Sequence, residues 1–373
     1  MNHMQRKTTV YVVIAIMAIA AVSGAVYYLN DDRSDNDSGP LTVTDVLGRT
    51  VTLPAEVTKI VCLSAGSVRL VTYFGSEAVD RIVGIDSYDA GTTANPSNYD
   101  MATYRLAYDL RGIANVGSED NYKDIIATGA QVIITSKTSA ADVETIQTNT
   151  GITVVAVSAD GSIDVDEAGF EQDIRLVGQV LGMDARAQTL LDGIAALGQE
   201  LSDCRAAMQT SATCYVGGMF YFMKGGLYMT TGSYYPFVVT GATNTMPDSN
   251  NGNPYQTDKK ALMEAGADYL FIDGMTLTAS SATFAADRAD LSTTVNAVQD
   301  GNIYATWAYK YYGTNWENEL VNAFFIGAVL DPTAFSYDVT EKAQAILDLF
   351  FPDAGLTVAA VAAQQGEMTQ LAW

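Results

Sequence analysis

The densest group of aromatic side chains in the chain lies between Thr306 and Gly313. This segment carries Trp307, Tyr309 and Tyr311, and a loop of such length cannot bury every ring. Flat aromatic faces suit macrocycles, catecholates or other large chelates better than a bare ion. A tyrosine phenolate can also ligate ferric haem iron. We therefore expect this loop to form one wall of a ligand-binding site.

A second candidate group follows a run of buried-strand character that ends at Leu63. Ser64 and Ser67 flank an Ala-Gly pair there, at the start of a predicted helix. Backbone N–H groups at such a position, together with the helix dipole, favour an anionic or carbonyl-rich ligand; a tight turn with a serine cap is the alternative. Arg69 in the first helical turn works against the dipole. It either binds a ligand carboxylate or oxyanion, or forms a surface ion pair.

Further candidates come from three segments rich in tyrosine or arginine. The run 219–229 has two apolar arms around Lys-Gly-Gly and is typical of a hairpin. Residues 230–236 then lead into the next predicted helix. The polar segment 91–111 is long for a connection in a compact lobe, and such loops usually have a function. The residues that we expect to line or rim a cleft are Arg105, Tyr221, Tyr234 and Tyr235.

Alternating strands and helices must position these loops. Buried strands are predicted at 57–63, 81–85, 131–135 and 152–157, and, where the pattern restarts, at 214–217, 268–272 and 302–305. Between the two sets, a proline-free stretch predicts a helix over roughly 185–208, about 36 Å long, with Asp184 as its N-cap. The predicted fold class is α/β, with two Rossmann-like lobes joined by one long α-helix. Ligands of such sheets bind beyond the carboxyl ends of the strands.

The amino terminus predicts export. The uncharged run Thr8–Asn30 would span about 30 Å of hydrocarbon. Arg6 and Lys7 precede it and acidic residues follow it, which places the amino end inside and the bulk of the chain outside. A transmembrane anchor is one interpretation, and a cleavable signal peptide with small residues at 21–25 is the other. The folded part is extracytoplasmic in both cases, either tethered to the outer face of the membrane or secreted.

These observations divide the chain into six predicted parts. They are the anchor or signal peptide at 1–30, a polar tether at 31–40, an N-terminal α/β lobe at 41–165, a connecting helical region at 166–209, a C-terminal α/β lobe at 210–352 and a C-terminal tail at 353–373.

Composition excludes several classes of function. The chain has 43 acidic and 20 basic residues and a formal charge of −23. This balance argues against nucleic-acid binding, which needs a basic surface. His3 is the single histidine and lies in the leader. Chemistry that depends on a histidine base or a His-ligated metal is therefore excluded for the folded part.

The cysteines and glycines give no sign of catalysis. Cys62, Cys204 and Cys214 are too few for a disulfide framework. Cys62 and Cys214 lie in apolar runs and should be buried thiols, while a Cys204–Cys214 bridge is an open alternative. The Gly-Gly pairs at 217 and 225 do not form a phosphate loop. We predict a monomer that is not an enzyme, with no catalytic residue, no resident metal and no cofactor.

An ordered series of segments resembles the helical-backbone (class III) binding proteins of ABC importers for siderophores, haem, cobalamin and some oxyanions. The series spans roughly residues 41–350, and Gly313–Asn318 with the apolar helix to Leu330 is similar to archaeal members. The segments that carry the resemblance are 44–54, 59–61, 83–86, 116–117 with 125–126, 130–134 and 313–330.

The resemblance implies a ligand cleft between the lobes, with little closure because the connecting helix is rigid. It also implies an ABC permease and its ATPase as partners. Tyr88 and Trp307 match family positions that contact the ligand.

In this family one glutamate on each lobe pairs with arginines of the permease. The matching positions here are Lys123 and Lys259, each beside an acid, Asp124 and Asp258. Either the permease carries acids at these contacts, or the correspondence is shifted by one residue, or the lysines are ordinary surface charges.

The resemblance therefore implies an extracytoplasmic solute-binding protein for a metal chelate. A ferric siderophore or related iron complex comes first, followed by a corrinoid. The alternatives are an oxyanion-binding protein of the molybdate type and a ligand sensor without a cognate transporter.

Overall fold

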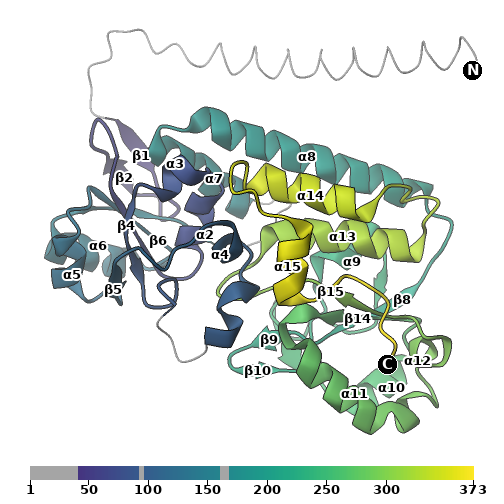
Figure 1. The fold of residues 1–373 in the computed structure, drawn as a ribbon. Helices are drawn as coiled ribbons and strands as arrows, with labels where there is room; N and C mark the ends of the chain where they lie inside the picture. The colour runs from purple at the N-terminus through teal and green to yellow at the C-terminus, as the bar shows by residue number, and fades with distance from the viewer. Residues whose placement is uncertain (1–40, 92–95, 160–167) are drawn as a thin grey trace, which may run out of the picture. The chain divides into compact units, whose positions relative to one another are not determined.

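The computed structural model describes residues 41–91, 96–159 and 168–373. Residues Thr42–Trp373 form one compact unit, which contains two α/β lobes and the helices that join them (Figure 1). The predicted anchor or signal peptide at 1–30 and the tether at 31–40 lie outside the described residues. Within the described ranges, no helix combines the length and the apolar composition needed to cross a membrane.

The N-terminal lobe is built on a five-stranded parallel sheet with the order β5-β4-β3-β6-β7. β3 and β6 are buried along their whole length, as expected for a parallel sheet covered on both faces. An antiparallel pair, β1 with β2, precedes the sheet. The strands are β1 (Thr42–Thr44), β2 (Thr50–Thr52), β3 (Ile60–Leu63), β4 (Ile82–Asp86), β5 (Asn115–Gly117), β6 (Val132–Thr135) and β7 (Thr153–Ala156). The helices are α2 (Ser67–Thr72), α3 (Ser76–Val79), η1 (Pro96–Met101), α4 (Tyr104–Ala107), α5 (Tyr122–Ala127) and α6 (Ala140–Thr150).

The C-terminal lobe has a four-stranded parallel sheet with the order β12-β8-β14-β15. Two short antiparallel pairs, β9 with β10 and β11 with β13, lie outside it. The strands are β8 (Thr213–Gly217), β9 (Phe220–Tyr221), β10 (Lys224–Gly225), β11 (Met229–Thr230), β12 (Thr243–Asn244), β13 (Tyr255–Gln256), β14 (Tyr269–Asp273) and β15 (Ile303–Thr306). The helices are α9 (Tyr235–Thr240), α10 (Lys259–Ala265), η2 (Gly274–Thr276), α11 (Leu277–Leu291), α12 (Asn296–Asp300), α13 (Trp316–Leu330), α14 (Val339–Phe350) and α15 (Val358–Gln365).

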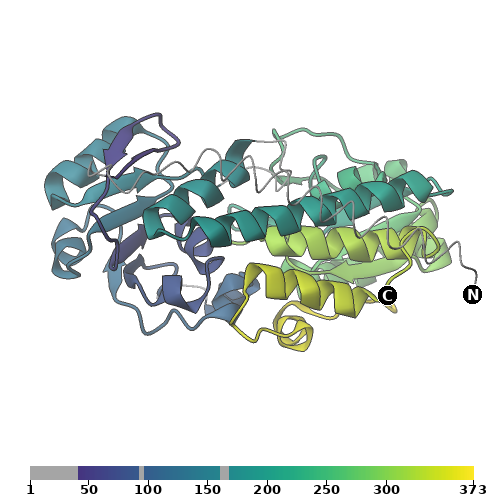
Figure 2. The ribbon, with the colours of Figure 1, turned by 90° about the horizontal axis from the view of Figure 1, so that it is seen from above.

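The predicted parallel sheets and the predicted long helix are both confirmed. α7 (Ala168–Leu181) precedes α8 (Asp184–Ala207), which has 24 residues and buries Leu190, Leu191, Ile194 and Leu201. Figure 2 shows α8 running lengthwise over both lobes beside α14. The predicted N-cap is wrong by one residue. Met183 holds that position without a side-chain hydrogen bond, and the Asp184 carboxylate lies in the first turn, where the helix dipole favours it.

The last part of the chain contacts both lobes. α15 packs against η1 of the N-terminal lobe. Beyond it, Gln370 forms an antiparallel bridge with Tyr304, and the Leu371 N–H donates to the Ile303 carbonyl at 2.7 Å. Residues 353–373 therefore join the two lobes and cover the outer edge of β15.

A shared aromatic core lies where the lobes meet. The Tyr73 ring lies 4.9 Å from Phe350, and Phe170 lies 4.8 Å from Trp316. The Tyr73 hydroxyl donates to Glu317 Oε2 at 2.7 Å. The residue that follows α2, together with residues from α7, α13 and α14, thus contributes to a single apolar cluster, so the lobes are packed together as well as connected by the chain.

Buried polar side chains fix the same junction. Gln365 Oε1 accepts from the Ala308 N–H at 3.0 Å and from Asn318 Nδ2 at 2.9 Å, and its Nε2 donates to Thr103 Oγ1 at 3.1 Å. On α8, Arg186 donates to the carbonyl oxygens of Tyr73 and Leu349, at 2.7 and 2.5 Å. Each of these side chains bonds groups of both lobes, which restricts their relative movement.

All three cysteines are free thiols. Cys62 and Cys214 are buried, as predicted, and Cys204 is half-buried. Burial raises the pKa of the Cys62 and Cys214 thiols. The disulfide considered between Cys204 and Cys214 is not formed.

Candidate ligand-binding site

A cavity of about 720 Å³ lies at the carboxyl ends of the strands of the N-terminal sheet. Its position follows from the parallel topology, which brings the loops after β3, β4, β5 and β6 to one edge. The C-terminal lobe contributes Tyr312. The lining consists of Ser64, Ala65, Asp86, Ser87, Tyr88, Gly117, Ser118, Glu119, Asp120, Asn121, Lys137 and Tyr312.

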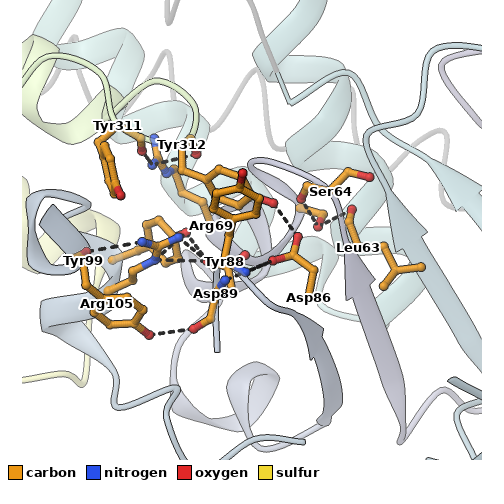
Figure 3. Close-up of polar contacts among 12 residues, drawn as sticks. Leu63, Ser64, Arg69, Asp86, Tyr88, Asp89, Tyr99, Arg105, Tyr311 and Tyr312 are labelled. Carbon is orange, nitrogen blue, oxygen red and sulfur yellow. Dashed lines mark hydrogen bonds and ion pairs between the residues drawn. The ribbon is translucent and has the colours of Figure 1, made fainter. Parts of the chain in front are cut away.

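Asp86, the last residue of β4, connects the two lobes at the cavity (Figure 3). Its Oδ1 accepts from the backbone N–H groups of Tyr88 and Asp89, at 2.8 and 3.0 Å. Its Oδ2 accepts from the Tyr312 hydroxyl of the other lobe. Burial, reinforced by the charge of Asp89, raises the pKa of Asp86, whereas these hydrogen bonds act to lower it.

Tyr88 and Tyr312 form a stacked pair beside this carboxylate. Their ring centroids are 4.7 Å apart and their planes differ by 20°. Tyr88 is 53% exposed, so one face of the pair is open to solvent. Tyr312 has a left-handed backbone with φ of 49°, a conformation that non-glycine residues adopt rarely and often at functional sites.

Arg69 holds the loop that carries Tyr312. Its Nη2 donates to the carbonyl oxygens of Tyr311 and Tyr312, at 2.9 and 3.3 Å, and the guanidinium lies 4.8 Å from the Tyr104 ring centroid. The side chain is completely buried. Arg69 therefore positions the loop of the C-terminal lobe and does not line the cavity.

Arg105 performs a similar task from α4. It forms a buried ion pair with Asp89, with Nη2 2.8 Å from Oδ1, and the Tyr104 hydroxyl donates to the same oxygen. Its guanidinium lies 5.4 Å from the Tyr312 ring centroid and 5.7 Å from that of Tyr311. Tyr311 is half-buried between Arg105 and Phe220. Arg105 and Tyr311 thus pack next to the Tyr88–Tyr312 pair and help to hold it in place.

Two acidic residues and one lysine from the loops after β5 and β6 also line the cavity. Glu119 and Asp120 follow β5, and Lys137 follows β6. Lys137 Nζ forms an ion pair with Glu119 Oε1. Partial burial acts to raise the pKa of Glu119, but the hydrogen bond and charge of Lys137 outweigh it and hold this pKa below its ordinary value. Sequence reasoning missed these residues, although the rule that ligands bind after strand ends applies equally to the loops after 115–117 and 131–135.

Of the predicted ligand-binding residues, Ser64 and Tyr88 line the cavity. Ser67 is buried, and its hydroxyl donates to the Leu63 carbonyl at 2.8 Å and the Ser64 carbonyl at 3.0 Å. These bonds close the tight turn between β3 and α2, as in the alternative interpretation, but the N-cap position of α2 is held by Gly66. Ser64 itself has φ of 69°, which turns the chain sharply at the end of β3.

The predicted aromatic wall of the C-terminal lobe is mostly core. Trp307 is completely buried, Tyr309 packs 5.0 Å from Tyr234, and all three lie away from the cavity lining. The physical reason is that the two halves of the loop have different surroundings. Residues 307–309 lie against β14 and α13, where large rings bury most apolar area. Tyr312, in the second half, reaches the N-terminal lobe. Tyr221 and Tyr235 are half-buried and also outside the lining.

The four candidate docking residues occupy helix starts. Lys123 and Asp124 are exposed in the first turn of α5. Asp258 caps α10 by accepting from the Ala261 N–H at 2.8 Å. Lys259 Nζ binds Asp290 Oδ2 at 2.6 Å and Asp287 Oδ1 at 3.1 Å. The charge of Lys259 is therefore balanced by two carboxylates of α11.

Among the described residues, no three histidine, cysteine or carboxylate side chains are grouped so as to hold a metal ion. The polar groups that line the cavity are serine and tyrosine hydroxyls, three carboxylates, the Asn121 amide and the Lys137 ammonium group.

Two α/β lobes, a long connecting helix and a cavity at the strand ends together define a two-lobe binding protein. A family model described as periplasmic binding protein matches residues 60–309, more than half of the sequence, and the chain belongs to this family. Members of the family bind small ligands and work with ABC permease and ATPase components.

Solved structures share this fold at low sequence identity. A periplasmic solute-binding protein from Veillonella parvula has a TM-score of 0.65 at 16% identity, covering 88% of this chain and 97% of that one. The molybdate-binding protein MolA of Haemophilus influenzae, bound to molybdate, has a TM-score of 0.62 at 17% identity, covering 84% and 98%. CeuE of Helicobacter pylori with Ni(II) bound has a TM-score of 0.60 at 16% identity, covering 87% and 99%. No curated protein matches the chain.

Proposed function

We propose that this chain is the extracytoplasmic solute-binding protein of an ABC importer, and that it binds a metal chelate in the cavity and delivers it to the permease. A ferric siderophore or related iron complex is the first candidate, and a corrinoid is the second. The protein acts as a monomer and catalyses no reaction on its ligand.

The observation that carries the proposal is the size and placement of the cavity. A volume of about 720 Å³ lies within the range of small-molecule sites, roughly 300–1,000 Å³, and greatly exceeds the space that a bare oxyanion occupies. Both lobes contribute to the lining, since Tyr312 reaches Asp86. A ligand there would touch both lobes at once.

The direct test is titration of the purified chain with ferric chelates, cobalamin, haem and molybdate, followed by tryptophan emission and calorimetry. We expect saturable binding of an iron chelate. A response to molybdate alone would replace the chelate with the oxyanion alternative, and turnover of any ligand would contradict a purely binding role.

The site assignment is tested by Tyr88→Ala. Because the Tyr88 ring is exposed and stacks on Tyr312, its removal should weaken chelate binding about tenfold, the effect of losing one aromatic contact. The melting temperature should stay within a few degrees, since little buried area is lost. Ile126→Ala on α5 is the matched control, because Ile126 is similarly exposed, at 48%, and lies outside the lining. Unchanged affinity in Tyr88→Ala would exclude this cavity as the chelate site.

Docking and location complete the proposal. We propose that the starts of α5 and α10, with Lys123, Asp124, Asp258 and Lys259, face the permease, and that residues 1–30 anchor the protein to the membrane or are cleaved on export. Adjacent genes for a permease and an ATPase would support an importer, and their absence would favour the sensor alternative. The resemblance of 313–330 to archaeal members stays a prediction.

A further inference from the structure

The charges that line the cavity are unbalanced. Asp86, Glu119 and Asp120 are acidic, and Lys137 is the one cationic side chain in the described lining. Lys137 is already paired with Glu119. A ligand that enters therefore meets two carboxylates in excess, and no cation of the described lining is left to neutralise an anion.

Neighbouring arginines do not correct this imbalance. Arg69 directs its Nη2 at two carbonyl oxygens of the 311–312 loop. Arg105 is bound to Asp89, with side chains 2% and 0% exposed. Both arginines, shown with their partners in Figure 3, lie outside the cavity lining, so an anionic group in the cavity would lose its hydration without gaining a charged partner.

Two further features suit a cation. The Asp86 carboxylate accepts three hydrogen bonds, which oppose the rise in its pKa caused by burial and by Asp89, and a cationic group beside it would favour its ionised form further. The open face of Tyr88 beside it presents the negative face of an aromatic ring, to which cations are attracted. A positively charged group could therefore contact a carboxylate and a ring together.

We infer that the cavity selects metal chelates of net positive charge over neutral and anionic ones. The inference rests on the proposed function and narrows its ligand class. The formal charge of −23 acts in the same direction at longer range, because a strongly negative protein attracts cations and repels anions before contact.

The test uses one chelate in three charge states. A linear ferric trihydroxamate that ends in a primary amine carries +1, its N-acetylated form is neutral, and its N-succinylated form carries −1. The iron centre is the same in all three. Calorimetry with the full chain should show that affinity falls about tenfold for each unit of positive charge removed, the size of effect expected for one charge at intermediate screening. High salt should bring the affinities of the three chelates closer together, because it screens charge.

Paired variants give effects of opposite sign. Asp120→Asn removes one negative charge and should reduce the preference for the +1 chelate about tenfold. Lys137→Gln removes the positive charge and should increase the preference by a similar factor. Mere damage to the site would weaken binding in both variants. Glu144→Gln on α6 is the control, because Glu144 is exposed and outside the lining.

The outcomes separate the inference from the proposed function. Tightest binding of the +1 form, with opposite shifts in the two variants, supports both. Equal or tighter binding of the −1 form overturns charge selection and leaves chelate binding intact. If no form binds, the proposal of a chelate receptor fails, and the inference fails with it.

Discussion

At the scale of single residues, Tyr312 links the two lobes at the cavity. It belongs to the C-terminal lobe, yet its hydroxyl donates to Asp86 of the N-terminal lobe and its ring stacks on Tyr88. Its backbone has φ of 49° and is held by Arg69. The cavity is thus completed by a residue whose position depends on how the two lobes meet.

Tyr312→Phe separates the hydrogen bond from the stacking. The variant keeps the ring but leaves the buried Asp86 carboxylate without one donor. A hydrogen bond to a charged group contributes about 1.5–3 kcal/mol, so we expect the free energy of unfolding to fall by about 1–2 kcal/mol. Urea titration provides the measurement. Tyr269→Phe, in a half-buried tyrosine of β14, is the control and should change by less than about 0.5 kcal/mol.

Glu319 predicts a pH dependence of stability. Burial raises its pKa to about 8 in the folded protein, whereas the unfolded value is about 4.3. Between these two values the native state binds more protons than the unfolded state. The free energy of unfolding should therefore fall as pH rises from about 4.5 to 8 and then level off. Asp273, whose burial raises its pKa to about 7, acts in the same direction.

Glu319→Gln should remove the Glu319 part of this slope. The variant should unfold with less pH dependence than the wild type in urea titrations at pH 5, 6.5 and 8, and at pH 8 it should be the more stable by a few kcal/mol at most. Glu144→Gln, at an exposed site, should leave the slope unchanged. An identical slope in Glu319→Gln and the wild type would contradict the assignment.

At the scale of elements, the β9–β10 hairpin differs from its prediction in an instructive way. The sequence placed the turn at Lys224–Gly226, but Tyr221 pairs with Lys224, so Phe222 and Met223 form the turn. Their φ values are 44° and 64°, and their side chains are 80% and 81% exposed. Such a turn normally selects Asn-Gly. Two apolar residues therefore occupy a strained and solvated position.

Replacing the pair by the preferred turn should relieve this strain. The double variant Phe222→Asn/Met223→Gly should increase the free energy of unfolding by about 1 kcal/mol, because left-handed φ is unfavourable for both native residues. Differential scanning calorimetry would register this as a higher melting temperature. Lys224→Asn, one position later in the strand, should give no gain, and a gain there would point to surface charge as the cause.

The sequence predicted strands and helices better than the directions of side chains. Runs such as Ile60–Leu63 and Val132–Thr135 predict buried strands because parallel sheets need continuous apolar residues. Trp307 and Tyr309 were predicted to face the ligand, yet both are buried and lie outside the cavity lining. An aromatic residue in a loop has the same sequence signature whether it covers a ligand or fills the core. Glu119 and Asp120 were missed because surface acids are common in a chain of this charge.

At the scale of the whole molecule, the junction of the lobes depends on a few buried polar groups. Gln365 is 2% exposed and bonds Ala308, Asn318 and Thr103. Arg186 links α8 to the carbonyl oxygens of both lobes. We expect the closure between the lobes to be limited, since opening would break several buried hydrogen bonds together.

Gln365→Ala tests the junction. It leaves the buried Ala308 N–H without its partner, which costs about 1–3 kcal/mol. It also removes one hydrogen bond each from Asn318 and Thr103, which keep their bonds to the Ala308 carbonyl oxygen and to each other. We expect a loss of about 2–4 kcal/mol in unfolding free energy and weaker chelate binding, because Tyr312 would lose its fixed approach to Asp86. Gln370→Ala is the control, since its Nε2 donates to Gly301 at an exposed site. Equal stability of the two variants would contradict a special role for Gln365.

The position of α15 along the chain has a consequence for biogenesis. Residues 358–371 come after every element that they join, so during synthesis they emerge after both sheets. Domains generally fold as units and in chain order, so each lobe can form while the junction is still incomplete. Ligand competence should then appear in one late step, when α15 settles against η1 and the following segment pairs with β15. Until that step we expect the chain to behave as two tethered domains whose joint is open to proteases.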